Sequence, residues 1–288
     1  MTAAQATTYG TRILYLLNNY GSSFLRGAGT TILIALVGTA VGCLIGFAVG
    51  IVQTIPATPK DSLPKKILLR VVKFLMALYV EVFRGTPMMV QAMFIFYGFA
   101  QYAKIHMGMW TAAFVILSIN TGAYMAETVR GGILSIDIGQ TEGAKAIGMT
   151  HYQTMLYVIF PQALRNIIPQ IGNNLIININ DSSVLNVLGT IELFYVAKQN
   201  AGAYYWYFEA MSVAMVIYLI LTFTCSRLLR WWEKKLDGPA SYDLATTDTL
   251  AYTSGMVKMP GTPEEVFQEH SKEAGANWNR NSDTRGGM

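Results

Sequence analysis

The stretch that decides the fold class reads GAGTTILIALVGTAVGCLIGFAVGIVQTIPATP, residues 27–59. It contains no charged residue and lies between Arg26 and Lys60. A helix needs about 20 mostly apolar residues to cross the hydrocarbon core of a bilayer, so this stretch is long enough for a first membrane span.

Glycines recur within this first span at a strict four-residue spacing. They are Gly38, Gly42, Gly46 and Gly50. One face of the helix is then free of side chains, which permits close backbone contact with another helix. The spacing therefore predicts a structural packing face, whose partner helix belongs either to this chain or to a second one.

The composition of the whole chain fits a membrane protein. Of its 288 residues, 52% are hydrophobic and 13% are charged, and the mean hydropathy is +0.35. Soluble domains carry roughly 25% charged residues. The net charge of +4 is small and gives no indication of nucleic-acid binding. Cys43 and Cys225 both lie in apolar segments, so they supply neither a disulfide framework nor a metal site.

Four further apolar segments predict an all-α, polytopic membrane protein with about five transmembrane helices. The second segment covers about 67–103 and is interrupted by EVFRGTP, residues 81–87, where Gly85 and Pro87 break a helix. We interpret it as one bent span with an amphipathic cytoplasmic lead-in. The other three segments are residues 109–128, 165–188 and 204–226.

The basic residues predict the orientation of these five spans. With the N-terminus outside, the cytoplasmic segments hold twelve Lys and Arg residues and the outer segments hold four. The positive-inside rule therefore favours N-out, C-in. The inner residues are Lys60, Lys65, Lys66, Arg70, Lys73, Arg130, Lys145, Arg165, Arg227, Arg230, Lys234 and Lys235, and the outer residues are Arg12, Arg26, Lys104 and Lys198.

This orientation divides the chain into three parts. Residues 1–25 are predicted to form an extracytoplasmic N-terminal segment, and residues 26–236 the transmembrane domain. Residues 237–288 are polar and lack a sustained apolar period, so we expect a disordered cytoplasmic tail.

The cytoplasmic loop between the third and fourth spans contains TEGAKAIGMTHYQTMLYVIFP, residues 141–161. Asp137 and Gln140 have the spacing of a helix N-cap and its reciprocal partner. They predict a short helix over residues 139–147 that stops at Gly148, because glycine commonly follows the end of a helix.

A second helix is predicted after that glycine. Thr150 and Gln153 repeat the capping spacing, and the helix they begin would run to Pro161 and end there. Two capped helices joined at a sharp corner form a rigid surface for a partner protein. An amphipathic loop helix lying on the membrane is the alternative, and the local pattern favours neither.

Charged residues inside the spans are candidate ligand groups. An unpaired charge at the bilayer centre costs at least ~2.5 kcal/mol, so such residues usually pair or face a cavity. Glu81 and Arg84 lie three residues apart and are predicted to neutralise each other. Glu127 has Arg130 at the same spacing, so ion pairing and substrate contact are both open for it.

Asp181 is the acid that most strongly indicates a polar cavity. It lies in NNLIININDSSVLN, residues 173–186, and has no basic neighbour within a helical turn. Gln91 and Asn120 are expected at similar depths, where they serve either a substrate or a hydrogen bond between helices.

Several stretches together resemble one family, the polar amino-acid permeases of bacterial ABC importers. Glu142, Ala144, Gly148 and Pro161 fall in register with the family's cytoplasmic EAA loop, with Gly143 at its second position. The other matching stretches are EVFRGTPMMVQAMFIFYG, INTGAYMAETVRGGI, GQTEGAKAIGM, VIFPQALRNIIPQIGNN and DSSVLNVLGTIELF. The resemblance covers roughly residues 26–236.

The resemblance implies an importer-type transmembrane domain and a set of partners. In this family the loop is a coupling helix that binds a separate ATPase subunit. Glu142 would make a polar contact there, Gly143 and Ala144 would allow close approach, and Gly148 would set the corner. This chain lacks the G-x-x-x-x-G-K-[ST] phosphate-binding sequence, so no cofactor is expected in it, and ATP and Mg²⁺ are expected on the partner.

The remaining implied partners are a second permease chain, identical or homologous, an extracytoplasmic substrate-binding protein, a polar amino acid and the lipid bilayer. The implied location is the cytoplasmic (inner) membrane of a prokaryote. No nucleic acid and no metal ion are expected.

The family pattern also bears on the substrate. Its fourth span usually reads Lys-Asp-Thr-Ser-Leu where this chain has Asn180, Asp181, Ser182, Ser183 and Val184. The acid is retained, and it suits the ammonium group of an amino acid. Because the lysine is absent, the site leans towards a neutral or cationic substrate.

Two other classes of function fit the sequence less well. An ion-driven secondary transporter or channel predicts inverted repeats and charged relays, and the sequence shows neither. An intramembrane enzyme needs a nucleophile with a base, or a set of metal ligands, and the predicted spans contain no such set.

Overall fold

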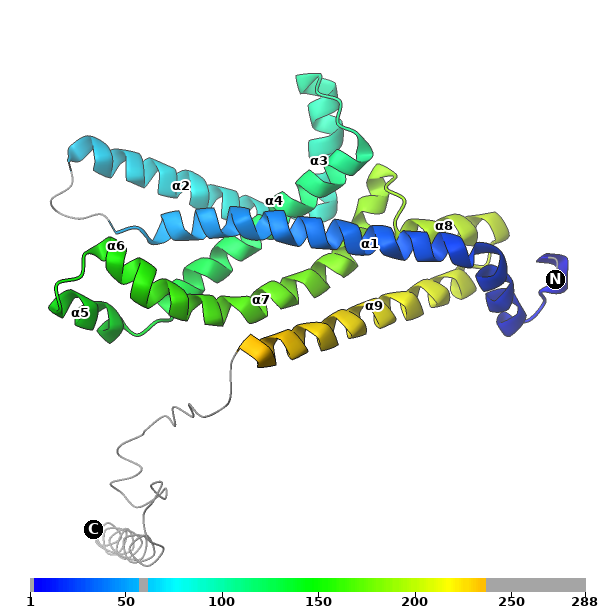
Figure 1. Ribbon diagram of the computed structural model, residues 1–288. Coiled ribbons are helices and arrows are strands. Elements are labelled where there is room, and N and C mark those ends of the chain that lie inside the picture. The colour runs from blue at the N-terminus through cyan, green and yellow to red at the C-terminus, as the bar shows by residue number, and fades with distance from the viewer. Residues whose placement is uncertain (1–2, 57–61, 237–288) are drawn as a thin grey trace, which may run out of the picture. The chain divides into compact units, whose positions relative to one another are not determined.

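The computed structural model describes residues 3–56 and 62–236, and all regular secondary structure in these ranges is helical (Figure 1). The all-α prediction is confirmed for this part of the chain, and the predicted tail, residues 237–288, lies outside it. The elements are the 3-10 helices η1 (Ala3–Gln5) and η4 (Ser182–Leu188), the π-helices η2 (Phe99–Ala103) and η3 (Met155–Ile159), and α1 (Tyr9–Thr54), α2 (Leu63–Gly85), α3 (Met88–Gly98), α4 (Met109–Leu134), α5 (Ile138–Ala146), α6 (His151–Thr154), α7 (Phe160–Asp181), α8 (Leu193–Tyr204) and α9 (Tyr207–Leu236).

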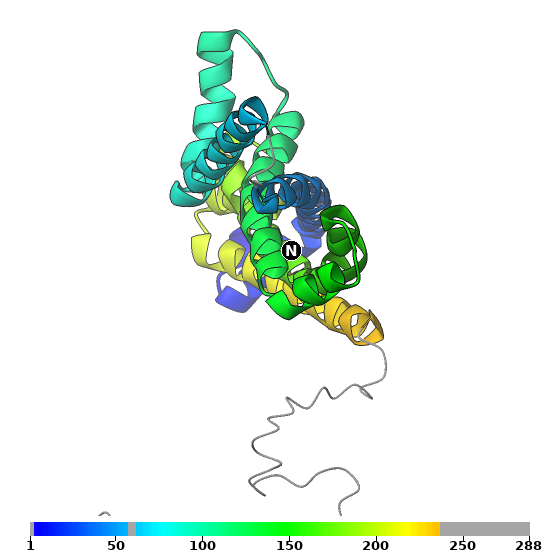
Figure 2. The same ribbon diagram turned by 90° about the vertical axis from the view of Figure 1, so that its left-hand side faces the viewer.

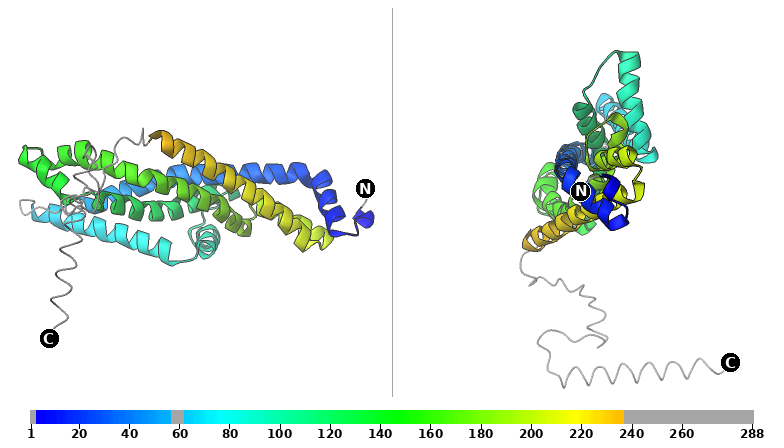
Figure 3. Two further views of the ribbon diagram at one scale, coloured as in Figure 1. Left: turned by 90° about the horizontal axis from the view of Figure 1, so that it is seen from below. Right: turned by 90° about the vertical axis from the view of Figure 1, so that its right-hand side faces the viewer.

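Within the described ranges, three helices are long and apolar enough to cross a membrane: α1, α4 and α9. The helices α2 and α7 have 23 and 22 residues, which at about 1.5 Å per residue also reaches across a hydrocarbon core of about 30 Å. Six of the 23 residues of α2 are charged, and α7 contains five asparagines and two glutamines. The helices α1, α4, α7 and α9 run lengthwise beside one another (Figures 1 and 3), whereas α3 stands away from them (Figure 2).

Helix α1 begins far earlier than the first apolar stretch. It has 46 residues and passes through Arg26 without a break, so its length is about 69 Å, twice what a bilayer core needs. The predicted boundary between residues 25 and 26 therefore does not coincide with a helix end. The first turns of α1 contact residues at and just before the start of α9. Arg12 forms a 2.8 Å ion pair with Glu209 and lies over the ring of Trp206.

The glycine face of α1 packs against α4 of the same chain. A Cβ atom added to Gly38 would lie 2.6 Å from Leu117 Cδ2, and one added to Gly50 would lie 2.8 Å from the carbonyl oxygen of Ala126. Gly42 and Gly46 meet Thr121 and Met125 in the same way. The predicted packing role is confirmed, and the partner is a helix of this chain.

The predicted break at residues 85–87 is also confirmed. Helix α2 ends at Gly85, and Pro87, which has no N–H to donate, is the N-cap of α3. The predicted pair between Glu81 and Arg84 is wrong: Arg84 instead lies 3.8 Å from Glu127 on α4 and over the ring of Tyr124. The bend at Pro87 thus separates α2 from α3, and Arg84 joins α2 to α4.

The loop helix does not end at Pro161, contrary to prediction. The chain is helical from α6 through η3 and α7, with Pro161 in the first turn of α7. A proline inside a helix cannot donate to the carbonyl four residues back, and its ring collides with that carbonyl. The π-helix η3, immediately before it, widens the turn, and the N–H of Phe160 bonds to Met155 O, five residues back.

Helix α8 was not predicted as a separate element. The fourth apolar segment ends with the 3-10 helix η4, and Gly189, with φ of +85°, then reverses the chain. The helix that follows packs against α1 and α9 (Figures 1 and 3).

Candidate functional site

The corner between α5 and α6 is fixed by hydrogen bonds on both sides. At the end of α5, the N–H of Gly148 donates to Lys145 O at 3.0 Å and the N–H of Met149 to Ala144 O at 3.1 Å, the Schellman pattern of helix ends. Gly148 has φ of +84°, a conformation that a side chain would strain. The predicted stop at Gly148 is confirmed.

Both predicted N-caps are present at this corner, but only one has its reciprocal partner. The carboxylate of Asp137 accepts a 2.6 Å bond from the N–H of Gly139. The side chain of Gln140 does not bond back; its carbonyl oxygen accepts instead from Gln162 on α7, at 3.4 Å. Thr150 and Gln153 form the full capping box predicted for them.

The surface of the α5–α6 corner that faces away from the rest of the chain is exposed. Glu142 and Gly143 are exposed, and nothing lies within 4 Å of a Cβ added to Gly143. Two large apolar side chains beside them, Ile138 and Ile147, are 73% and 79% exposed. Ala144 differs from its prediction: it is 6% exposed and packs on the chain itself, so its face offers no close approach to another protein.

A continuous helical backbone joins this corner to Asp181. It begins at the capping box of Thr150 and follows α6, η3 and α7 for about 45 Å. Hydrogen bonds between side chains brace its cytoplasmic part, from Gln162 to Gln140 and from Asn166 to Ser135 at the end of α4. The corner and the end of α7 are thus joined by one helical element.

Helix α7 ends at the residues predicted to bind substrate. Asp181 is half-buried and forms no hydrogen bond or ion pair with the described residues, so its carboxylate is free to bind a ligand. Ser182 is fully buried and donates to Ile179 O at 2.8 Å, and Ser183 is half-buried. The α-helix changes to a 3-10 helix between Asp181 and Ser182.

Asn178, one turn before Asp181, was not singled out from the sequence. It is buried, donates to Thr39 of α1 at 2.8 Å and accepts from Thr121 of α4 at 3.1 Å. These bonds attach the end of α7 to the pair of helices formed by α1 and α4. The amide-rich run was the available signal, but it does not show which amide faces inward.

The carboxylate of Glu127 forms ion pairs with two arginines. It lies 2.6 Å from Arg130 on the same helix and 3.8 Å from Arg84 on α2. Of the two possibilities open for Glu127, the structure thus shows the ion pair. The side chains remain partly exposed, so this triad is a polar link between α2 and α4 at the surface of the bundle.

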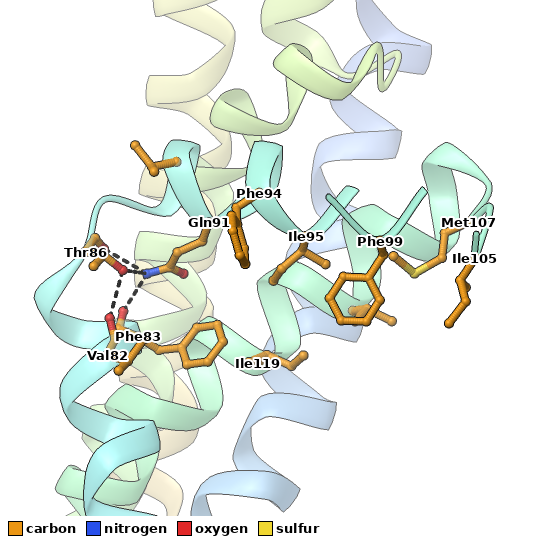
Figure 4. A pocket seen from close by; sticks show the side chains of 12 residues that line it. Val82, Phe83, Thr86, Gln91, Phe94, Ile95, Phe99, Ile105, Met107 and Ile119 are labelled. Atoms are coloured by element: carbon orange, nitrogen blue, oxygen red, sulfur yellow. Dashed lines mark hydrogen bonds between the residues drawn. The ribbon is translucent and has the colours of Figure 1, made fainter. Parts of the chain in front are cut away.

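Gln91 and Asn120 bond to each other and to the break before α3. Asn120 donates to Gln91 Oε1 at 2.9 Å. Gln91 donates in turn to Phe83 O and Thr86 O at 2.9 and 2.8 Å, as the dashed lines of Figure 4 show. They satisfy carbonyls that the helix break leaves without an intrahelical donor. Of the two possibilities left open by the sequence, the hydrogen bond between helices is the one seen.

The cavity beside Gln91 has a volume of about 700 Å³, and its wall is almost wholly apolar (Figure 4). A polar amino acid bound there would lose its hydration with few hydrogen bonds in return. Asp181 does not line this cavity, and no hydrogen bond or ion pair among the described residues joins Asp181 to Gln91, Asn120 or Glu127. The cavity is therefore a poor candidate for the substrate site. Its lining residues are Val82, Phe83, Thr86, Val90, Gln91, Phe94, Ile95, Phe99, Ile105, Met107, Val115 and Ile119.

Comparisons with known proteins identify the family of this chain. Residues 67–238 match the family described as binding-protein-dependent transport system inner membrane component. The glutamine transport system permease protein GlnP of Escherichia coli is 34% identical over 213 residues, which cover 74% of this chain and 92% of GlnP. The nopaline transport system permease protein NocM of Agrobacterium fabrum is 34% identical, over 72% of this chain and 86% of NocM.

A solved structure also resembles the chain. It is the crystal structure of an amino acid ABC transporter with histidines, with a TM-score of 0.69 and 33% sequence identity. The match covers 77% of this chain and 98% of the other.

Proposed function

The chain belongs to the family of binding-protein-dependent transport system inner membrane components, and we propose that it is the permease subunit of an ATP-driven importer of polar amino acids. The observation that carries this proposal is the helical connection from the α5–α6 corner to Asp181. It joins a surface built for a partner to an acid available for a ligand.

The proposed topology has five spans, with the N-terminus outside and the C-terminus in the cytoplasm of a prokaryote. The spans are α1, the bent pair α2 and α3, α4, α7 with η4, and α9. The lysines and arginines favour this orientation because the inner segments hold most of them. It places the α5–α6 corner in the cytoplasm and the start of α8 towards the outer side.

The ATPase partner would bind the corner. Glu142 supplies an exposed charge, Gly143 leaves room for a close approach, and Ile138 and Ile147 supply apolar contact area. ATP and Mg²⁺ would bind on that partner, because this chain lacks the phosphate-binding sequence. A second permease chain, identical or homologous, completes the pathway, and an extracytoplasmic binding protein delivers the substrate.

The substrate proposed for this chain is a polar amino acid that is neutral or cationic. The carboxylate of Asp181 would bind the ammonium group or a cationic side chain, with Ser182 and Ser183 beside it. Relatives are named as permeases for glutamine in Escherichia coli and for arginine in Bacillus subtilis, which supports this range. Gln91, Asn120 and Glu127 contribute by holding α2, α3 and α4 in place.

In the proposed cycle, closure of the ATPase pair on ATP moves the α5–α6 corners of the two permease chains together. Because α6, η3 and α7 form one helical element, this movement is carried to Asp181. The pathway then opens to the outer side, and ATP hydrolysis returns it to the inner side.

Reconstitution into liposomes tests the proposal. The purified chain, with its second permease, should take up no labelled glutamine or arginine until the cognate ATPase, ATP and the binding protein are added. Uptake driven by an ion gradient through the permease alone would instead support the alternative, a secondary transporter or channel.

A further inference from the structure

Asn178 is a buried amide that the proposed cycle leaves without a role. It is 3% exposed and lies in α7, one turn before Asp181. Its amide nitrogen donates to the hydroxyl of Thr39 on α1 at 2.8 Å, and its carbonyl oxygen accepts from the hydroxyl of Thr121 on α4 at 3.1 Å. No other side chain of α7, all of which the structure describes, bonds to both α1 and α4.

The glycine face of α1 brings these two hydroxyls together. Thr39 precedes Gly42 by three residues, so the two lie on one face of the helix. A Cβ atom added to Gly42 would lie 2.6 Å from the Cβ of Thr121, so Thr121 packs directly on the backbone of α1. Both threonines are buried. Asn178 therefore meets two hydroxyls whose positions are fixed by the packing of α1 on α4.

A carboxamide suits both hydroxyls, because it donates through its nitrogen and accepts through its oxygen. A leucine at position 178 would make neither bond, and an ionised aspartate would accept a bond but donate none. A buried polar group is unfavourable unless it is hydrogen-bonded, so the three side chains stabilise one another as a unit. We call Asn178, Thr39 and Thr121 the Asn178 clamp.

The Asn178 clamp holds the last turn of α7, and this turn carries Asp181. The N–H of Ser182 donates to the carbonyl oxygens of Asn178 and Asn180, which closes the end of the helix. Asp181 follows Asn178 by three residues, so its side chain lies about 60° away around the helix axis. Asn178 and Ser182 are buried, whereas Asp181 is half-buried at the edge of their face. Rotation of this turn would redirect the Asp181 carboxylate, and the clamp opposes that rotation.

From this geometry we infer that Asn178 is a positioning residue of the transport site, acting together with Thr39 and Thr121. By attaching the last turn of α7 to α1 and α4, the clamp sets the direction in which the Asp181 carboxylate meets the cationic group of the substrate. This inference rests on the proposed function, in which Asp181 binds the amino acid.

A double-mutant cycle between Asn178 and Asp181 tests the inference. The assembled permease and ATPase, in nanodiscs without the binding protein, are titrated with radiolabelled glutamine or arginine, whichever the wild type takes up. Asn178→Leu should weaken binding about tenfold, because it removes both bonds between the helices, and Asp181→Asn should weaken binding at least as much. The double variant should bind no more weakly than Asp181→Asn alone, because the clamp acts through that carboxylate.

Substitutions on α1 separate the hydrogen bond from general damage to packing. Thr39→Val removes the hydroxyl that accepts from Asn178 and should weaken binding about threefold, whereas Thr39→Ser keeps a hydroxyl and should restore wild-type affinity. Thr30→Val is the matched control, because the hydroxyl of Thr30 forms no hydrogen bond in the part of the chain that the structure describes, and its affinity should not change. If Asn178→Leu does not assemble, Thr39→Val replaces it in the cycle.

The outcomes distinguish this inference from the proposed function. Unchanged affinity in Asn178→Leu and Thr39→Val would overturn the positioning role, and so would unchanged affinity in Asp181→Asn. Losses that multiply in the double variant, or a loss in Thr39→Ser or Thr30→Val equal to that in Thr39→Val, would show a merely structural effect and overturn it as well. Each of these results leaves the importer assignment intact. Failure of the wild-type assembly to take up amino acid with ATP and the binding protein would contradict the proposed function itself.

Discussion

The starts of α6 and α8 are both helix N-termini closed by a side chain, but they are built in different ways. Thr150 caps α6 with the help of Gln153, three residues away, and both side chains are exposed. Glu192 caps α8 in a fully buried position and depends on Tyr218, 26 residues away along the chain. The first cap is local and belongs to the exposed α5–α6 corner, whereas the second is buried where α8 meets α9.

This comparison predicts unequal energies, and removal of the buried cap should have the largest effect. Glu192→Ala leaves the backbone N–H groups of Phe194 and Tyr195 and the Tyr218 hydroxyl without a partner in an apolar surrounding. We expect the free energy of unfolding to fall by about 3 kcal/mol. Unfolding of the purified chain by SDS in mixed micelles measures the change. A loss below about 1 kcal/mol would place Glu192 among ordinary surface caps.

Substitutions at the α5–α6 corner should lower the free energy of unfolding by less than Glu192→Ala does, and they should act through the backbone conformation. Gly148→Ala puts a side chain on a residue with φ of +84°, so the free energy of unfolding should fall by about 1–2 kcal/mol. Gly143→Ala is the matched control, because Gly143 is within α5 and an added Cβ meets nothing within 4 Å. That change should be neutral or stabilise the chain by up to about 1 kcal/mol. Equal effects of the two substitutions would show that the Gly148 conformation does not hold the corner.

The smallest effect on stability is expected at the exposed surface of the corner. Glu142→Lys should change the free energy of unfolding by less than about 0.5 kcal/mol, because Glu142 makes no described contact. The same variant should insert normally into the membrane but lower transport-coupled ATP hydrolysis at least tenfold in the reconstituted complex. Normal coupling in this variant would remove Glu142 from the proposed ATPase-binding surface.

The confirmed predictions concern contacts between residues close together in the chain, whereas the wrong ones concern contacts between different helices. The helix break at Pro87, the stop at Gly148 and the capping box at Thr150 depend on neighbours within a few residues, and all three are as predicted. The predicted pair of Glu81 and Arg84 has the correct spacing, yet Arg84 lies against Glu127 of another helix. Spacing makes a contact available, but the packing of α2 on α4 decides whether it forms.

Pro161 shows the reverse case, in which a local rule was overridden. Proline predicts the end of a helix because it lacks an N–H. The π-helix before it removes the conflict, so the helix continues to Asp181. This continuation connects the α5–α6 corner to the candidate substrate site. Neither the residue types nor their spacing predicted it.

By itself the sequence determined the membrane class, the helical content of the described ranges, the α5–α6 corner and the family. These follow from hydropathy, from caps and turns that span a few residues, and from motifs in register. Only the tertiary structure decided which helix meets the glycines of α1, that Glu127 is paired, that Gln91 and Asn120 bond each other, and that the buried Glu192 joins the start of α8 to α9. The physical reason is that these contacts join residues far apart in the chain, and the packing of the helices selects among partners that the sequence leaves equivalent.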